Sequence, residues 1–295
     1  MAGAGARVAG VLAPITTPFD ARTGNVVPER MRSNARTLVA AGLDGIVVAG
    51  STGEAPLLEA EEQRVLIAAA RDVIPDGRWL IAGTGAESTR ATIALTQAAA
   101  AEGADAVLVR PPGYFSTAHS PASLVDHFRA VADASPVPVL IYNIPKYTHL
   151  PLDPGLIRQL STHERIVGAK DSSGDAKNLA AYREAAPGWV MLVGSASLLY
   201  QGLALGCDGG VVGVACFAAE PCAALVAAYG AGDRARAGAI QEALIPLDRE
   251  IVGKLGPAGV KAAMEAVGLY GGPVRAPLAP LSPGDRERVA RLVTR

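Results

Sequence analysis

One lysine closes a buried apolar segment of this 295-residue chain. Residues 166–174 read as a short β-strand that ends in Lys170 and a turn. A lysine is rarely buried, because its ammonium group loses hydration. The side chain therefore either extends back to solvent, or is a desolvated amine, kept partly neutral, that can attack a carbonyl.

Hydroxyl groups and glycine-rich turns follow other predicted strands. The candidate site residues, in chain order, are Ser51, Thr52, Gly53, Tyr114, Tyr142, Lys170, Ser172, Gly194 and Val212. An imine on the lysine would withdraw electrons from the adjacent carbon, a phenol such as Tyr142 would carry a proton, and the Gly-Ser-Thr-Gly turn at 50–53 would hold a carboxylate. Each feature also has a structural interpretation, because such tyrosines often pack and such turns are often only turns.

The elements that must position these residues alternate between β-rich runs and helical patterns. The β-rich runs are residues 8–14, 45–50, 79–84, 106–109, 138–143, 166–170, 190–195 and 209–215. Eight strands, each followed by a helix, predict an α/β fold of the (β/α)8 TIM barrel type, whose active site lies at the carboxyl ends of the strands. We expect the barrel in residues 1–230 and a small helical region packed on it in 231–295. A doubly wound open sheet is the competing fold, and it needs a switch in strand order that the pattern does not indicate.

Composition argues against several classes of function. The net charge of −1 comes without a basic or acidic block, so neither nucleic acid nor a membrane surface is expected as a partner. Three cysteines without a CxxC pair, and no signal peptide or long apolar segment, predict a cytoplasmic protein with free thiols. Four scattered histidines indicate no metal site, and the turn at 83–88 lacks the third glycine and the lysine of nucleotide loops. No cofactor is expected.

Four motifs, taken together and in this order, resemble the dihydrodipicolinate synthase / N-acetylneuraminate lyase superfamily. They are Gly-Ser-Thr-Gly-Glu at 50–54, Tyr-Asn-Ile-Pro at 142–145, Gly-Ala-Lys-Asp-Ser at 168–172 and Gly-Ser at 194–195. The resemblance implies a class I pyruvate-dependent aldolase in which Lys170 forms a Schiff base with pyruvate or a similar 2-oxo acid. It implies that Tyr142 is the general acid/base, and that Ser51 and Thr52 bind the carboxylate and relay protons. It further implies a homotetramer, a dimer of dimers, in which Tyr114 is a relay residue lent across the dimer interface.

The resemblance also bears on the substrate. In dihydrodipicolinate synthases an arginine stands two residues after the proline of the tyrosine motif, and here that position holds Tyr147, preceded by Lys146. Segments at 87–92, 170–175, 194–196 and 270–278 instead resemble 4-hydroxy-2-oxoglutarate aldolases, which favours cleavage of a 4-hydroxy-2-oxo acid. The alternatives are the synthase, a non-catalytic 2-oxo-acid sensor, and a barrel with unrelated chemistry such as a phosphate-binding isomerase. Glu54 is either a catalytic acid or a helix-capping residue.

Overall fold

The computed structural model describes residues 7–294, which fold into a closed barrel of eight parallel strands paired in chain order. The strands are β1 (Gly10–Pro14), β2 (Gly45–Val48), β3 (Trp79–Gly83), β4 (Ala106–Val109), β5 (Val139–Asn143), β6 (Ile166–Asp171), β7 (Val190–Val193) and β8 (Gly209–Val211). Pairing of β1 with both β2 and β8 closes the barrel. The predicted (β/α)8 barrel is therefore confirmed, and the open sheet is excluded.

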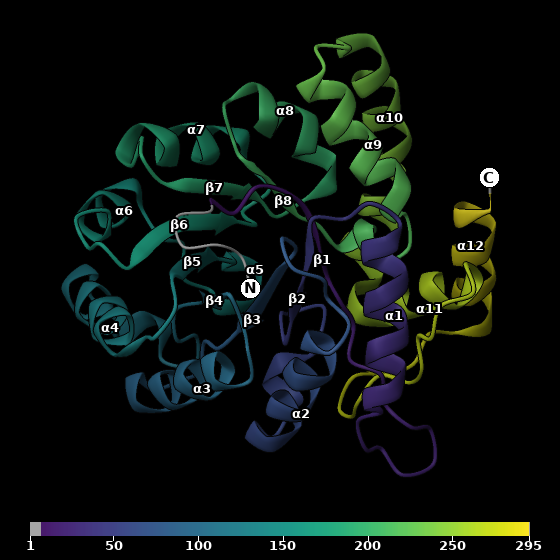
Figure 1. The fold of residues 1–295 in the computed structure, drawn as a ribbon, viewed down its shortest axis with the longest axis horizontal. Helices are drawn as coiled ribbons and strands as arrows, with labels where there is room; N and C mark the ends of the chain where they lie inside the picture. Colours follow the sequence, from purple (N-terminus) through teal and green to yellow (C-terminus); the bar gives the residue numbers. More distant parts are fainter. Residues whose placement is uncertain (1–6, 295) are drawn as a thin grey trace.

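Helices surround the strands, as Figure 1 shows. They are α1 (Pro28–Ala40), α2 (Ala60–Arg71), α3 (Thr89–Ala101), α4 (Pro121–Ala134), α5 (Pro145–Thr148), α6 (Pro154–Leu160), α7 (Ala176–Ala185), α8 (Leu199–Ala204) and α9 (Ala219–Gly230). Helix α4 begins as the sequence predicts: the Ser120 hydroxyl accepts a hydrogen bond from the Ser123 N–H, and Pro121 occupies the first turn.

Alternation along the strands divides the buried residues into two clusters. One cluster fills the inside of the barrel and includes Leu12, Leu140 and Leu192. The other lies between the strands and the helices and includes Ile141 and Ala169. Because neighbouring residues of a strand face opposite ways, Tyr142 continues the inward row of Leu140. The inside of the barrel is thus packed, and the space for a ligand lies at its mouth.

The chain continues past the barrel in a helical region at one side of the molecule (Figure 1). It contains α10 (Arg234–Leu247), a π-helical turn η5 (Asp248–Gly253), α11 (Lys254–Ala266) and α12 (Pro283–Val293). The sequence predicts separate helices at 233–253 and 257–268, and the structure agrees: the helix that continues from α10 through η5 breaks inside α11 at Gly256, whose φ of 57° and ψ of −145° are not helical, and helical backbone resumes at Pro257. Pro246 lacks the N–H that the regular ladder requires, which accounts for the wider turn that follows it.

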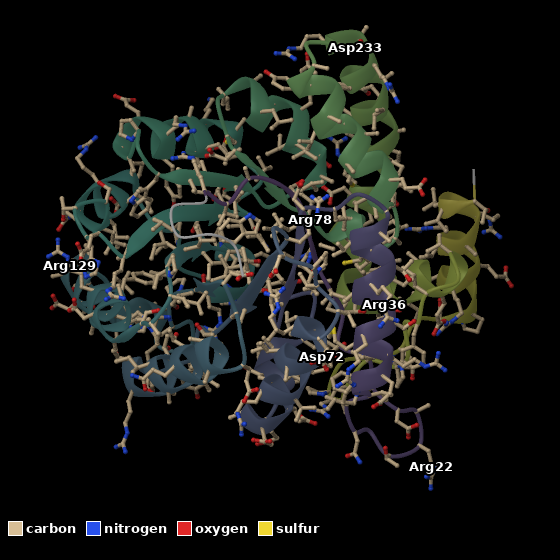
Figure 2. All side chains as sticks on the ribbon, viewed as in Figure 1. Arg22, Arg36, Asp72, Arg78, Arg129 and Asp233 are labelled. Carbon is tan, nitrogen blue, oxygen red and sulfur yellow. The ribbon has the colours of Figure 1, made fainter. Side chains whose placement is uncertain are left out.

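Charged side chains project outward around the barrel, for example at Arg22, Arg129 and Asp233 in Figure 2. Within residues 7–294, no helix is long and apolar enough to span a bilayer. The same residues contain no cluster of three or more histidine, cysteine or acidic side chains that could hold a metal ion.

Candidate active site

Lys170 and Tyr142 meet at the mouth of the barrel. Their Cα atoms are partners in the register between β5 and β6, so both side chains leave adjacent strands on the inner face. The Lys170 Nζ lies 4.2 Å from the centroid of the Tyr142 ring. Both residues are buried, with 4% and 6% of their surfaces exposed. The burial of Lys170 rules out the interpretation in which its side chain extends back to bulk solvent. The desolvated amine is the interpretation that remains.

Lys170 has no partner that would hold its charge. None of the hydrogen bonds or ion pairs found among residues 7–294 involves its amine. The other buried lysine, Lys261, differs: its Nζ lies 2.6 Å from a carboxylate oxygen of Glu54 and donates to the carbonyl of Pro273 at 2.5 Å. Charge is normally buried only when paired, so Lys261 has the environment of a structural lysine and Lys170 does not. An unpaired amine can present its lone pair to a carbonyl carbon.

Glu54 is therefore a structural residue. Its backbone is in the left-handed region at φ 58°, and its side chain makes no capping hydrogen bond. Besides pairing with Lys261, its carboxylate accepts the N–H of Arg275 at 2.8 Å. The side chain therefore does not cap the helix that follows, and Glu54 does not line the lysine cleft. The carboxylate instead attaches the turn after β2 to the C-terminal region.

The outward-facing ends of the same two strands fix the position of the lysine and the tyrosine. Asn143 donates to Asp171 at 2.7 Å, and Asp171 also accepts the Ser173 hydroxyl at 2.6 Å and the Asn178 amide at 3.0 Å. The side-chain oxygen Oδ1 of Asn143 accepts the N–H of Leu152 at 3.1 Å. Because these buried groups satisfy one another, the backbone that carries Tyr142 and Lys170 has little freedom to shift.

A cleft of about 400 Å³ opens above this pair. Of the predicted site residues, Ser51, Thr52, Tyr142, Lys170, Ser172 and Gly194 line it. The Ser51 and Thr52 hydroxyls donate no hydrogen bond within the described chain, so they are available to a bound molecule. The volume falls within the range of about 300–1,000 Å³ typical of small-molecule sites.

Gly194 is needed where β7 passes β6. A Cβ atom at this position would lie 1.9 Å from the Ser172 Oγ and 2.7 Å from the Asp171 carbonyl oxygen. Any side chain would therefore displace the turn that follows Lys170. Gly194 keeps the wall of the cleft close to the lysine, and it also leaves room for the Ser172 hydroxyl.

Three predicted site residues, Gly53, Tyr114 and Val212, do not line the cleft. Val212 belongs to the outer core between strands and helices, and Val211 faces the cleft in its place, because successive residues of an extended chain point to opposite sides. Gly53 is buried beside the turn, where its carbonyl accepts the Thr17 hydroxyl at 2.6 Å. The sequence motif covers both positions but does not show which way they face.

Tyr114 lies away from Lys170 within this chain. Its side chain is 82% exposed and packs edge-on against that of Phe115, which is also exposed. It borders a second hollow of about 600 Å³, which shares Ser51 and Tyr147 with the lysine cleft. The Glu87 carboxylate fixes the loop by accepting the N–H groups of Gly113 and Tyr114, each at 2.9 Å. A relay role for Tyr114 thus requires a surface beyond this chain.

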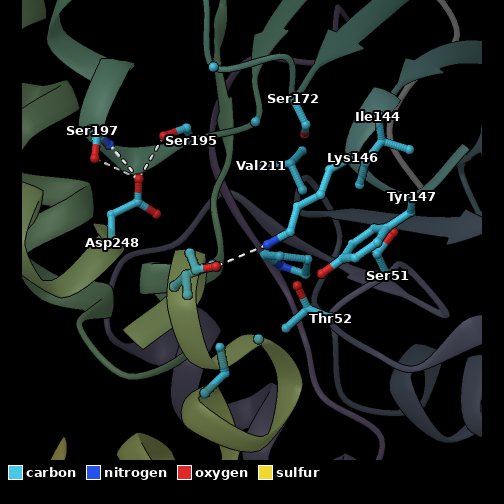
Figure 3. Close-up of a pocket in the computed structure, with 18 of the residues that line it drawn as sticks. Ser51, Thr52, Ile144, Lys146, Tyr147, Ser172, Ser195, Ser197, Val211 and Asp248 are labelled. Carbon is cyan, nitrogen blue, oxygen red and sulfur yellow. Dashed lines mark hydrogen bonds between the residues drawn. The ribbon is translucent and has the colours of Figure 1, made fainter. Parts of the chain in front are cut away.

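The rim of the lysine cleft carries a cation. Lys146 lines the cleft, and its Nζ donates to the carbonyl of Gly253 at 2.9 Å (Figure 3). No carboxylate of the described chain pairs with it. Tyr147 lines the same cleft, and burial raises the pKa of its phenol. The sequence does not show whether Lys146 extends into the active site. The structure places its side chain in the lining of the lysine cleft.

The opposite wall contains an aspartate that sequence reasoning missed. Asp248 is 7% exposed, and one of its oxygens accepts the Ser195 hydroxyl at 2.6 Å, the Ser197 hydroxyl at 2.8 Å and the Ser197 N–H at 2.8 Å. Figure 3 shows the carboxylate turned toward both serines. Asp248 comes from the turn η5 rather than from a strand end, so the rule that locates barrel active sites gives no signal for it.

Comparison with known proteins agrees with this arrangement. The model of the dihydrodipicolinate synthetase family matches residues 7–295. A 4-hydroxy-tetrahydrodipicolinate synthase of Moorella thermoacetica is 36% identical over 281 residues, covering 95% of each chain. A protein of Emericella nidulans named "Probable 4-hydroxy-2-oxoglutarate aldolase, mitochondrial" is 37% identical over 289 residues, covering 96% of this chain and 92% of that one.

A solved structure shares the whole architecture. It is a prophage protein of the dihydrodipicolinic acid synthase family from E. coli K12, determined in complex with pyruvate, with a TM-score of 0.92 and 29% identity over 98% of each chain. Synthases and an aldolase thus stand among the relatives, so the similarity identifies the enzyme class without selecting one substrate. With the family model matched along nearly its whole length, this chain belongs to the dihydrodipicolinate synthetase family of lyases and aldolases.

Proposed function

We propose that this protein is a class I aldolase that cleaves a 4-hydroxy-2-oxo acid, such as 4-hydroxy-2-oxoglutarate, into pyruvate and an aldehyde. The observation that carries the proposal is the unpaired Lys170 amine beside Tyr142, at the base of a cleft with free hydroxyl groups. A non-catalytic 2-oxo-acid sensor would need groups that hold the carboxylate, but it would have no use for a lysine and a phenol next to each other.

The reaction begins when the neutral Lys170 amine attacks the C2 carbonyl of the substrate and water leaves, giving an imine. Once protonated, the imine accepts electrons from the C3–C4 bond. Tyr142 removes the proton of the C4 hydroxyl as that bond breaks, so C4 departs as the aldehyde carbonyl. The remaining enamine takes up a proton at C3, and water then hydrolyses the imine, releasing pyruvate and the free lysine.

The 2-oxo-acid carboxylate is assigned to the turn after β2. The Ser51 and Thr52 hydroxyls face the cleft, and neither donates within the described chain. Hydroxyls and N–H groups of such turns are suited to hold an oxyanion. On the other side, Ser172 and Gly194 border the same space. Binding at this turn would place the C2 carbonyl toward Lys170, which is the orientation that imine formation requires.

Lys146 favours an aldehyde half that carries a carboxylate. It is a cation at the rim of the cleft, and its described contacts are the Gly253 carbonyl and the Tyr147 ring. The synthase is the second candidate, because relatives with that name match the chain as well as the aldolase does. The tyrosine at position 147, in place of the arginine expected of synthases, argues for the aldolase.

Two measurements test the proposal. Borohydride reduction in the presence of pyruvate should add mass to Lys170, as read by peptide mass spectrometry, and an unmodified Lys170 would exclude the imine. Pyruvate release from 4-hydroxy-2-oxoglutarate and from N-acetylneuraminate is then compared with condensation of pyruvate and aspartate semialdehyde. Faster turnover of aspartate semialdehyde than of every 4-hydroxy-2-oxo acid would favour the synthase.

We further propose that the active assembly is a homotetramer, a dimer of dimers, in which Tyr114 serves the cleft of a partner. Support comes from the exposure of Tyr114 and Phe115 beside a hollow that shares residues with the lysine cleft. Light scattering should report four copies, and Tyr114→Phe should lower turnover without preventing the borohydride adduct. A fully active monomer would refute this assembly.

A further inference from the structure

One wall of the lysine cleft combines a carboxylate with two serines in a fixed hydrogen-bond direction. An ionised carboxylate only accepts hydrogen bonds, so the Ser195 and Ser197 hydroxyls must both direct their protons at Asp248. The serine oxygens therefore keep only lone pairs for other partners. Ser195, Ser197 and Asp248 all line the cleft. This wall can consequently accept hydrogen bonds from a ligand but has no hydroxyl proton to give.

The other Asp248 oxygen, Oδ1, is left without a donor. The three hydrogen bonds to this side chain all end on Oδ2, and no residue of the described chain donates to Oδ1. In Figure 3, Oδ1 is turned away from the serines. Oδ1 is not among the fully buried atoms that lack a partner, so a molecule in the cleft that Asp248 lines can reach it and donate a hydrogen bond.

The turn η5 connects the Asp248 carboxylate, a hydrogen-bond acceptor, with the contact to Lys146, a hydrogen-bond donor. It begins at Asp248 and ends at Gly253, whose carbonyl accepts the Lys146 ammonium. A single π-helical turn thus carries the acceptor wall at one end and contacts the cationic rim at the other. Turns of this kind are rare in helices and recur at functional sites.

We propose that Asp248 is a specificity-determining residue that accepts a hydrogen bond from a hydroxyl group on the aldehyde half of the substrate, beyond the C4 hydroxyl that reacts. This inference rests on the proposed aldolase function and, within its substrate class, favours 4-hydroxy-2-oxo acids with at least one further hydroxyl over 4-hydroxy-2-oxoglutarate, which has none. Ser195 and Ser197 are positioning residues, because they hold the carboxylate in place through Oδ2.

The charges around the wall select a hydroxyl over the alternatives. A second carboxylate would be repelled by Asp248 and would meet no donor from the two serines. An ammonium group would be repelled by the cationic residues that line the cleft, Lys146 and Arg249. A hydroxyl is neutral and supplies the single proton that Oδ1 lacks.

The test measures condensation of pyruvate with paired aldehydes of equal carbon number, glyceraldehyde against propanal and glycolaldehyde against acetaldehyde. For each pair, the quantity is the ratio of kcat/KM for the hydroxylated aldehyde to kcat/KM for the plain one. Comparing this ratio between wild type and variant cancels the intrinsic reactivity of the aldehydes. Asp248→Asn keeps the volume, but its amide would turn an N–H group toward the cleft, so the ratio should fall about 10- to 100-fold.

Gln241→Met is the matched control. Gln241 is buried and also ties α10 to the segment after β7, donating to the Ala196 carbonyl at 2.8 Å and accepting the Tyr200 N–H at 2.7 Å, but it does not line the cleft. A loosened contact between these segments should lower both rates together and leave the ratio unchanged. If Asp248→Asn does not fold, Asp248→Glu, which displaces the oxygens by one methylene, is measured in the same way.

The outcomes separate the inference from the function on which it rests. Absence of the pyruvate adduct at Lys170 refutes the aldolase itself. An adduct with an unchanged ratio in the Asp248 variants refutes the role of Asp248 and leaves the aldolase standing. A wild-type enzyme that uses propanal as well as glyceraldehyde also overturns the inference. A ratio that falls in the Asp248 variants but not in Gln241→Met supports it.

Discussion

The two buried lysines, Lys170 and Lys261, should respond in opposite ways to replacement by methionine. Methionine keeps most of the apolar length of lysine and removes its charge. Lys261 lies 2.6 Å from the Glu54 carboxylate, and the side chains of the pair are 2% and 0% exposed. Lys170 has no ion pair among the described residues and contacts the Tyr142 ring. One substitution therefore breaks a buried pair, and the other breaks none.

The structure sets the size of each effect. Lys261→Met leaves Glu54 charged, buried and unpaired, which costs about 3–5 kcal/mol of unfolding free energy. An unfolding entropy of about 2.1 cal/mol/K per residue gives about 0.6 kcal/mol/K for this chain, so Tm should fall by about 5–8 °C. Lys170→Met loses a cation–π contact worth about 0.5–2 kcal/mol but no longer buries an ammonium group, so the two terms oppose. Its Tm should stay within about 2 °C of the wild-type value.

Thermal unfolding at one fixed protein concentration measures both shifts, and pyruvate release measures activity. Lys170→Met should abolish turnover while remaining folded, and Lys261→Met should retain turnover at temperatures well below its lowered Tm. The double variant Glu54→Gln/Lys261→Met should recover part of the lost stability, because it no longer contains the orphaned charge. Equal destabilisation by both methionine variants, or turnover by Lys170→Met, would refute the distinction between the two lysines.

Three further predictions concern the rim of the cleft and the acid range. In steady-state assays, Lys146→Met should raise KM about tenfold for a substrate with a distal carboxylate and leave KM unchanged for neutral aldehydes. Lys254→Met, which removes an exposed lysine outside the cleft, should change KM for neither kind of substrate. Burial, with smaller effects of neighbouring charges, lowers the pKa of His127 to about 4. Between about pH 6.5 and 4 the unfolded chain therefore binds a proton that the native protein does not, so the free energy of unfolding should decline as pH falls through this range. Urea titrations should show a weaker decline in His127→Gln. The hydrogen bond from Arg275 lowers the pKa of Glu62, so this pair should stabilise the fold above pH 4.5 and lose its contribution at more acidic pH. The same urea titrations should show no such loss in Arg275→Met, because the pair is already broken in that variant.

Much of the barrel can be predicted from the sequence, because its strands are continuous apolar runs between turn residues. Parallel strands buried on both faces produce this pattern directly. The rule that active sites lie at the carboxyl ends of barrel strands then predicts that Lys170 and Tyr142 lie together, as the pairing of β5 with β6 confirms. Ser51, Thr52 and Gly194 follow from the same rule and line the cleft. Local pattern and topology were sufficient for all of these.

The remaining features depend on direction and on contacts distant in sequence. Val211 rather than Val212 faces the cleft, since the facing is fixed by the phase of the strand within the barrel, and a short glycine-rich run does not reveal that phase. Glu54 and Lys261 are separated by more than 200 residues, and neither sequence neighbourhood indicates the other. Asp248 follows Pro246 in what reads as an ordinary amphipathic helix, so the π-helical turn that presents it has no separate signature.

The division of the site between two parts of the chain suggests how its specificity is set. The imine-forming lysine, the phenol and the carboxylate turn come from β2, β5 and β6 and the turns that follow them, where neighbouring strands hold them rigidly. The aldehyde half instead meets Lys146 on the short helix α5, and Asp248 on the turn η5 outside the barrel. Substitutions in η5 can therefore exchange a hydrogen-bond acceptor for a donor without moving the strands that carry Lys170. On this reasoning the strand ends determine that a 2-oxo acid is activated, and the segments around them determine which partner is released.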